Sequence, residues 1–345
     1  MKYNRNYYIK ENEELYIHKG KKLFVNNGNF CYFNSILQCL FNCIELSDYF
    51  LSNIYINDIH SNGYTARIYN NLLSLYWKEN GTIDPHVLLK NISNKTYNYS
   101  DNNQEDSHEC LLHILECLHG NIDYKINISI KGEPTNEIDK LTLMYMESYK
   151  MHYENSFSKI KEMFNGMFIN TLECGKCNKK DYNFEPFNNI TLNISDALPE
   201  SLSNFFSQKE INDYKCDNCK HKEFKKDVKI WSLPNNLILH LNKLDNKDNM
   251  NFPLNNLDLT KFISKLNGDF NNYIYDLYSV NFHKGNKNNG HFYSACKDIS
   301  DNWILYDDSS VSKIHESTVL NTVNHIDAYI LFYRRKFIKE KLQVE

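Results

Sequence analysis

The sequence predicts an α+β fold in which helices come first and a mostly antiparallel sheet follows. In the first third of the chain, apolar side chains recur at the three- and four-residue spacing of helices that bury one face. From Phe224 onwards, short apolar or aromatic runs are separated by turn residues, which is the pattern of strands. Two Cys-x-x-Cys pairs lie between these regions and indicate a metal-binding segment.

Composition bounds the classes of function. The 345 residues are 41% hydrophobic and 14% aromatic, which suits a globular protein with a large core. A net charge of -4 gives no reason to expect nucleic acid, and no apolar run is long enough to span a membrane. Ten cysteines without a signal peptide predict a reducing compartment, the cytoplasm and/or the nucleus.

The first predicted core helix follows Cys31. Phe33, Ile36, Leu37 and Leu40 share one helical face, and a polar turn that contains Gly28 precedes the cysteine. Cys31 is therefore expected at or just before the first helical turn, where free backbone N–H groups and the helix dipole stabilise a thiolate. A buried structural thiol is the alternative, and the position alone leaves both interpretations open.

Three further elements complete the predicted helical part. A helix is expected around 64–77, a short strand over 124–130 from its alternating isoleucines, and a poorly amphipathic helix over 136–152. A helix that opens near Gln104 carries Asp106 and Glu109 in its first turn and is expected to end at Gly120. Helix capping is the simple explanation of the two acidic residues.

The two cysteine pairs are Cys174 with Cys177 and Cys216 with Cys219. Four thiolates from two such turns suit one tetrahedral zinc ion, which would be structural because no position is left for water. The intervening residues, 178–215, are more than usual, and they contain a strand-like stretch at 189–194 and an amphipathic one at 198–206. We therefore predict a zinc ribbon with a structured insertion; the alternative, disulfides, is disfavoured in a reducing compartment.

The C-terminal strands place a histidine beside carboxylates. Predicted strands cover 229–233, 237–241, 275–283, 291–298, 303–307 and 328–333. His291 follows a loop over 283–289, and Asp307 and Asp308 come one hairpin later. A cysteine nucleophile needs an imidazole to take its proton and a carboxylate to fix the tautomer of that imidazole. Strand alternation turns Asp307 and Asp308 to opposite faces, so only one is expected to reach His291, and we favour Asp307.

These motifs resemble those of the ubiquitin-specific proteases, a family of papain-like cysteine deubiquitinases. The stretch around Cys31 is similar to the family's cysteine box, 104–110 to its glutamine-aspartate motif, and 290–293 with 303–308 to its histidine box. All occur in the family's order across residues 23–335. The resemblance implies a right-hand fold with a helical thumb (23–165), zinc-ribbon fingers (166–228) and a β palm (229–335). An N-terminal arm (1–22) and a short basic tail (336–345), which is a solvated helix end or a nuclear address, flank these parts.

The resemblance also implies roles for single residues. Cys31 is the expected nucleophile, His291 the general base, Asp307 the residue that orients His291, and Asp308 an accessory group near the site. Asn26 and the backbone N–H of Cys31 are the expected oxyanion donors. Gln104, Asp106, Glu109 and Phe292 fall where the family binds the arginine-bearing tail of ubiquitin. The expected partners are ubiquitin and ubiquitinated proteins.

Five residues depart from the family pattern without touching the nucleophile, the base or the oxyanion donor. They are Phe30 for threonine, Glu105 for glutamine, Cys110 for phenylalanine, Asn289 for glycine and Phe292 for tyrosine. The sequence therefore favours an active thiol isopeptidase. A catalytically silent ubiquitin-binding scaffold and a protease for another ubiquitin-like modifier are the alternatives; the intact catalytic set disfavours the first, and the paired acidic residues disfavour the second.

Overall fold

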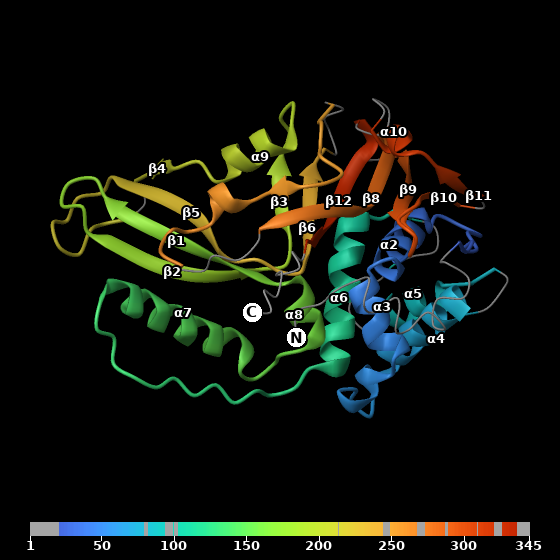
Figure 1. Ribbon diagram of the computed structural model, residues 1–345, viewed down its shortest axis with the longest axis horizontal. Coiled ribbons are helices and arrows are strands. Elements are labelled where there is room, and N and C mark those ends of the chain that lie inside the picture. The colour runs from blue at the N-terminus through green and yellow to red at the C-terminus, as the bar shows by residue number, and fades with distance from the viewer. Residues whose placement is uncertain are drawn as a thin grey trace, which may run out of the picture.

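The computed structural model describes residues 21–78, 82–93, 99, 103–212, 214–243, 249–267, 273–286, 289–308, 310–320 and 326–336. Most of the predicted N-terminal arm and nearly all of the basic tail lie outside these residues. The fold is α+β, with a helical part, a four-stranded sheet and an eight-stranded sheet (Figure 1). Among the described helices, none is both long and apolar enough to cross a membrane.

The helical part precedes both sheets in the chain. Its elements are α2 (Cys31–Phe41), α3 (Ile44–Leu51), η2 (Ile54–Asn57), α4 (Tyr64–Lys78), α5 (His86–Ser93), α6 (Ser107–Ile122), α7 (Glu137–Tyr153) and α8 (Lys159–Phe164). Every residue of α2 is buried, because α3 and α6 pack on one side of it and strand β9 on the other. The helix that carries Cys31 is therefore the centre of the largest apolar cluster.

The four-stranded sheet has the order β2-β1-β5-β4 and is wholly antiparallel. Its strands are β1 (Gly166–Cys174), β2 (Lys180–Phe187), β4 (Lys209–Ile211) and β5 (Phe224–Ser232). Helix α7 covers one face, where Leu141 and Tyr153 pack with Ile169, Phe184 and Trp231. This sheet corresponds to the expected fingers with two exceptions: β5, predicted as part of the palm sheet, belongs here, and the strand predicted at 189–194 belongs to the eight-stranded sheet.

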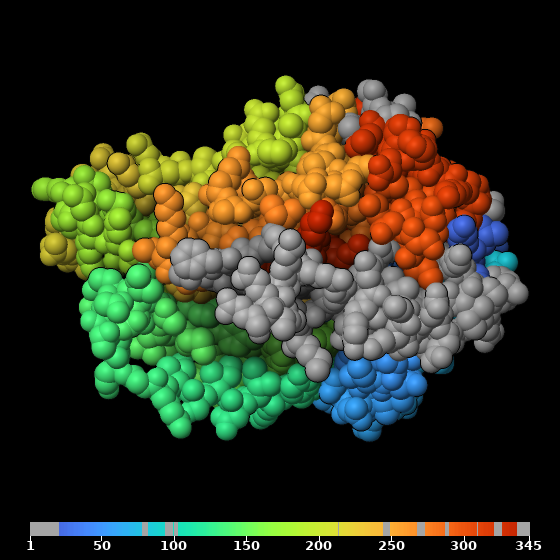
Figure 2. Space-filling model, viewed as in Figure 1, coloured from blue at the N-terminus to red at the C-terminus, as the bar shows by residue number. Residues whose placement is uncertain are grey.

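The eight-stranded sheet is the expected palm. Along β11-β10-β9-β8-β12-β6-β3, with β7 paired to β8, all pairs are antiparallel except β3 with β6. The strands are β3 (Ile190–Asn193), β6 (Asn236–Asn242), β7 (Leu257–Asp258), β8 (Ile274–Asn286), β9 (Asn289–Lys297), β10 (Trp303–Asp307), β11 (Ser310–Ile314) and β12 (Ala328–Arg335). Helix α9 (Leu198–Phe205), η3 (Thr260–Phe262) and α10 (Glu316–Val319) complete this part. In the same view, Figure 2 shows the green and yellow residues of the four-stranded sheet at one end of the molecule and the orange-red residues of the C-terminal strands towards the other.

Most predicted elements are confirmed, and three further predictions are corrected. The strand expected over 124–130 is wrong: only Tyr124 forms a bridge, to Phe157, and the alternating isoleucines are half-buried. Along this extended segment, Lys150 of α7 donates a hydrogen bond to the carbonyl of Ile128 and Ile126 packs into the α7 cluster, so the alternation reflects packing on a helix rather than in a sheet.

The other two corrections concern a helix end and a loop. Gly120 does not end α6, which continues to Ile122 and is followed by Asp123. The loop expected over 283–289 is mostly strand: His283 pairs with Phe292 and Gly285 with Gly290, so β8 and β9 form a long hairpin. Glycine, lysine and asparagine favour a loop locally, but the hydrogen-bond ladder of the hairpin overrides this preference.

Candidate active site

The structure brings Cys31, His291 and Asp307 together from three elements. Cys31 begins α2, His291 lies near the start of β9, and Asp307 ends β10. His291 Nε2 lies 2.6 Å from Asp307 Oδ1, which leaves Nδ1 as the nitrogen available to the thiol. The register explains the approach: β9 and β10 are adjacent antiparallel strands, and α2 packs on β9.

The environment of His291 favours its protonated form. A hydrogen bond with Cys31 is the largest cause that raises the pKa of His291, to about 9, and the Asp307 hydrogen bond and the Asp308 charge add to it. Partial burial of the ring opposes the rise. A raised imidazole pKa beside a thiol favours the thiolate–imidazolium pair, which is the form that a cysteine protease uses.

Asp308 occupies the same site from the end of β10. It adopts a left-handed backbone conformation, with φ of 47°, so the chain turns and strand alternation no longer separates the two carboxylates. Asp308 Oδ2 lies 3.8 Å from His291 Nε2, and Asp308 Oδ1 accepts a 2.8 Å hydrogen bond from Asn26 Nδ2. Only Asp307 is within hydrogen-bond distance of His291, as expected, while Asp308 lies near the imidazole and is held by Asn26.

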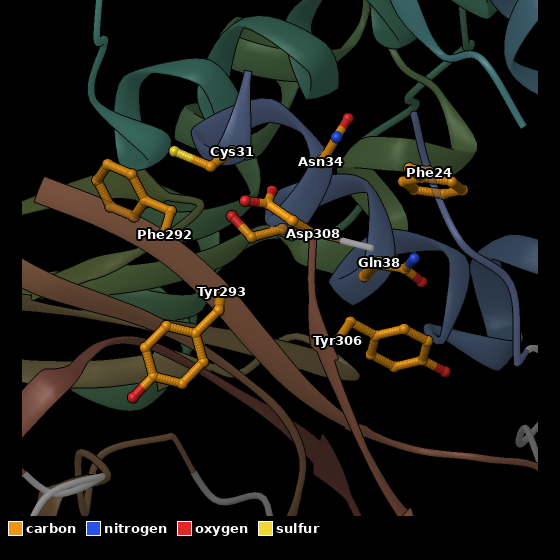
Figure 3. Close-up of a pocket in the computed structure, with 9 residues that line it drawn as sticks. Phe24, Cys31, Asn34, Gln38, Phe292, Tyr293, Tyr306 and Asp308 are labelled. Carbon is orange, nitrogen blue, oxygen red and sulfur yellow. The ribbon is translucent and has the colours of Figure 1, made fainter. Parts of the chain in front are cut away.

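Asn26 is held in place by the turn before α2. Its Oδ1 accepts from the backbone N–H groups of Gly28 and Phe30, at 3.3 Å each, and its Nδ2 donates to Asp308. Figure 3 shows the Asp308 carboxylate beside α2, between the side chains of Cys31 and Gln38. These bonds fix the side chain of Asn26 in the turn that directly precedes the helix of Cys31.

The four residues expected to bind substrate fall around the thumb–palm junction. Gln104 Oε1 accepts a 3.0 Å hydrogen bond from Gly290 N, and Phe292 is buried in the pocket that Cys31 lines. Asp106 caps α6 by accepting from His108 N at 2.7 Å and from the Tyr329 hydroxyl at 2.8 Å. Glu109 is exposed in the first turn of α6. The capping explanation therefore holds for Asp106, whereas the carboxylate of Glu109 is exposed to solvent.

Several neighbours of the site were missed from the sequence. Asn34, Ser35 and Gln38 line the pocket with Cys31, and the helical spacing of α2 places them there. The contact of Tyr329 with Asp106 joins residues 223 positions apart, and no local sequence pattern predicts it.

The four predicted metal ligands meet at the tip of the four-stranded sheet. The sulfur atoms of Cys174, Cys177, Cys216 and Cys219 all lie within 4.8 Å of one another, and the Cys174–Cys219 and Cys177–Cys216 sulfur pairs are 3.5 and 3.6 Å apart. These separations are too long for disulfides and close to the spacing of about 3.8 Å that zinc–sulfur bonds of about 2.3 Å give in a tetrahedron.

The two cysteine turns have the same construction. Cys174 N donates to Lys179 O, and Cys216 N donates to His221 O. The residues after Cys177 and Cys219, Asn178 and Lys220, both have left-handed backbones, with φ of 57° and 62°. The backbone N–H of Lys179 is the largest cause that lowers the pKa of Cys177, to about 6. The matching turns bring the four sulfur atoms close enough to share one metal ion.

Comparison with known proteins agrees with this geometry. The family model described as ubiquitin carboxyl-terminal hydrolase matches residues 24–333. The chain belongs to this family. Human ubiquitin carboxyl-terminal hydrolase 2 is 30% identical over 316 residues, covering 84% of this chain and 51% of that protein. Ubiquitin carboxyl-terminal hydrolase 10 of Arabidopsis thaliana is 40% identical over 130 residues, covering 35% and 13%.

Solved structures of the family share the fold. The SAGA Ubp8/Sgf11/Sus1/Sgf73 DUB module bound to ubiquitin aldehyde aligns with a TM-score of 0.73 at 23% identity, covering 94% of this chain and 71% of that one. This similarity identifies the right-hand fold of the ubiquitin carboxyl-terminal hydrolases. The chain spans about half the length of the curated relatives that it matches over most of its length.

Proposed function

We propose that the protein is a cysteine-type deubiquitinase, which hydrolyses the isopeptide or peptide bond after the C-terminal glycine of ubiquitin. The observation that carries the proposal is the assembly of Cys31, His291 and Asp307 from three separate elements, in a member of this family. Its partners would be ubiquitin and ubiquitinated proteins, in the cytoplasm and/or the nucleus. The proposed units are the thumb, fingers and palm of one catalytic domain (23–345), preceded by an arm (1–22) and ended by a basic tail (336–345).

The proposed reaction begins with the thiolate. His291 takes the proton of Cys31, and Asp307 fixes the ring so that Nδ1 faces sulfur. The thiolate attacks the carbonyl carbon of the terminal glycine, and Asn26 Nδ2 and the backbone N–H of Cys31 hold the oxyanion. His291 then protonates the leaving amine. A water molecule, deprotonated by His291, cleaves the thioester and returns the free thiol.

The tail of ubiquitin would enter between α6 and the β8–β9 hairpin. Glu109 attracts its basic side chains, Asp106 shapes the helix end that faces them, and Phe292 forms an apolar wall beside Cys31. Gln104 bonds to Gly290 across this entrance, and we propose that this contact opens or shifts when the tail binds.

We further propose that the four fingertip cysteines hold one structural zinc ion. Cys174, Cys177, Cys216 and Cys219 supply four sulfur ligands at spacings that suit a tetrahedron, and no position remains for a reacting water. The ion would join the β1–β2 turn to the segment before β5, so it would stabilise the fingers rather than take part in the reaction.

The test is reaction with an electrophilic ubiquitin probe, followed by mass-spectrometric mapping of the modified residue. The proposal requires that Cys31 is modified, that a ubiquitin C-terminal amide reporter is hydrolysed, and that Cys31→Ala still binds ubiquitin. Binding without any hydrolysis would support the silent scaffold. Cleavage only of reporters made from another modifier, such as a SUMO-like protein, would change the substrate.

A further inference from the structure

We propose that Asn281 is a positioning residue for the reaction at Cys31. Its buried side-chain amide joins helix α2, which carries Cys31, and helix α6, which carries Asp106 and Glu109, to strand β8. Strand β8 pairs with β9, which carries His291. The inference deepens the proposed function and rests on it.

Asn281 lies on β8 and is fully buried. Its Nδ2 donates a 2.8 Å hydrogen bond to Ser35 Oγ of α2, and its Oδ1 accepts a 2.8 Å hydrogen bond from Ser107 Oγ of α6. Both hydroxyls are buried as well. Ser35 also donates to the carbonyl of Tyr32, at 3.1 Å, so its hydroxyl is fixed at both ends.

Each partner stands next to a residue of the proposed site. Ser35 lies one helical turn after Cys31, on the same face of α2. Ser107 directly follows Asp106, which caps α6 and is itself held by Tyr329 of β12. Strand β8 pairs with β9 through Asn281 and Ser294, only three residues from His291.

A polar group suits this position because apolar packing alone does not fix a register. Helix α2 contacts β8 and β9 and shares one apolar cluster with Tyr278, Phe292 and Cys296 of these strands. Apolar packing of this kind loses uniqueness of arrangement before it loses stability. The amide of Asn281 has one donor end and one acceptor end in a rigid plane, so it holds α2 on one side and α6 on the other in a single arrangement. A displacement of about 1 Å at the reacting atoms can lower a rate by about 100-fold.

Asn281→Leu keeps the approximate volume and leaves the hydroxyls of Ser35 and Ser107 without their partner. A triple variant, Ser35→Ala with Asn281→Leu and Ser107→Ala, removes all three polar groups and thereby the penalty of leaving them unsatisfied. Ser279→Ala is the matched control. Ser279 lies two residues earlier on the same face of β8, is fully buried, and its Oγ has no hydrogen-bond partner among the described residues.

Three experiments separate positioning from simple stability. They measure the melting temperature, the kcat and KM for a ubiquitin amide reporter, and the rate at which iodoacetamide alkylates Cys31 at mildly acidic pH. Iodoacetamide reports on the stabilised thiolate without any need for ubiquitin. We expect Asn281→Leu to lower the melting temperature, and the triple variant to recover most of that loss. In the triple variant, kcat should stay at least about 10-fold below wild type, and alkylation of Cys31 should stay slow.

The proposal is overturned if the triple variant regains wild-type kcat and alkylation rate together with its melting temperature, because Asn281 would then be structural only. It is also overturned if Ser279→Ala slows both reactions as much as Asn281→Leu does. If the wild-type protein hydrolyses no ubiquitin reporter, the proposed function fails, while the alkylation rates still decide the role of Asn281.

Discussion

Asn26 donates a 2.8 Å hydrogen bond to Asp308, which stands 282 residues later in the chain. The bond joins the turn before α2 to the end of β10, and so it joins the proposed oxyanion donor to the carboxylate pair beside His291. Asp308 is therefore placed to orient Asn26, whereas Asp307 is placed to orient His291.

The first prediction follows from this bond. Asn26→Ala should lower kcat by about 10²–10³ with little change in KM, because the oxyanion exists only on the reaction path. Asp308→Ala should lower kcat less, since Asn26 keeps its bonds to the turn. A double-mutant cycle on kcat should show that the double variant is no slower than Asn26→Ala. Fully additive losses would show that Asp308 acts directly on His291 instead.

The second prediction concerns pH. The pKa of His291 is raised from 6.5 to about 9, chiefly by its hydrogen bond with Cys31. We expect kcat/KM to persist through neutral pH and to decline as the pH rises through about 9, where the imidazolium loses its proton. Asp307→Asn should lower kcat strongly and move this decline to lower pH. Asp227→Asn, in β5 of the fingers, is the control. If kcat/KM of Asp307→Asn declines at the same pH as that of the wild type, Asp307 does not act on the imidazole of His291.

The same shift links folding to pH. A raised folded-state pKa means that His291 contributes stability that is fully present below its unfolded pKa of about 6.5 and is lost as the pH rises through about 9. In His291→Gln, the free energy of unfolding should therefore depend less on pH over this interval than it does in the wild type. Parallel stability curves for the two proteins would contradict the assignment.

The third prediction separates the two acidic residues of α6. Glu109→Lys should raise KM for ubiquitin, because a charge-assisted bond is worth about 1.5–3 kcal/mol. It should lower the melting temperature only modestly, because Glu109 is exposed and a charge in the first helical turn is worth about 0.3–1 kcal/mol. Asp106→Lys should also lower stability, since the lost helix cap alone costs about 0.5–2 kcal/mol. Glu116→Lys, exposed on the same helix, is the control for a general charge effect. An unchanged KM in Glu109→Lys would remove it from the substrate site.

The fourth prediction concerns Gly290. A Cβ at this position would lie 2.0 Å from His283 Nε2, and the His283 ring is packed against Phe292, at 4.5 Å between centroids. Gly290→Ala should displace His283 or the hairpin and disturb the neighbouring His291, so kcat should fall. Gly120→Ala is the contrast: nothing lies within 4 Å, and alanine favours the helix by about 0.5–1 kcal/mol. The melting temperature of Gly120→Ala should rise and its kcat should not change. If both variants changed kcat to the same extent, the steric argument for Gly290 would be refuted.

The fifth prediction concerns the fingers. Metal analysis of the purified protein should find about one zinc ion per chain, and Cys216→Ser should reduce this content and lower the melting temperature. Cys117→Ala, in α6 and away from the cluster, should keep the zinc. Stoichiometric disulfides in place of metal would reverse the assignment.

The sequence by itself determined the order of helices and strands, the cysteine turns and the set of candidate catalytic residues. These features depend on short-range patterns: the period of apolar side chains, the Cys-x-x-Cys spacing, and motifs a few residues long. Tyr64–Lys78 and Trp303–Asp307 illustrate this, because both formed almost where their periodicity predicted. The strand expected at 124–130 failed because alternation shows that one side is buried, and not whether a sheet or a helix buries it.

Only the tertiary structure decided that Asp307 contacts His291 and that Asp308 contacts Asn26. Alternation predicted that Asp307 and Asp308 point apart, but the left-handed backbone of Asp308 turns its side chain back towards Asn26. Only the tertiary structure also showed that Asp106 is bonded to Tyr329, and that Asn281 joins Ser35 to Ser107. Such contacts join residues up to hundreds of positions apart. They are set by the packing of helices on a sheet, which no local pattern of residues encodes.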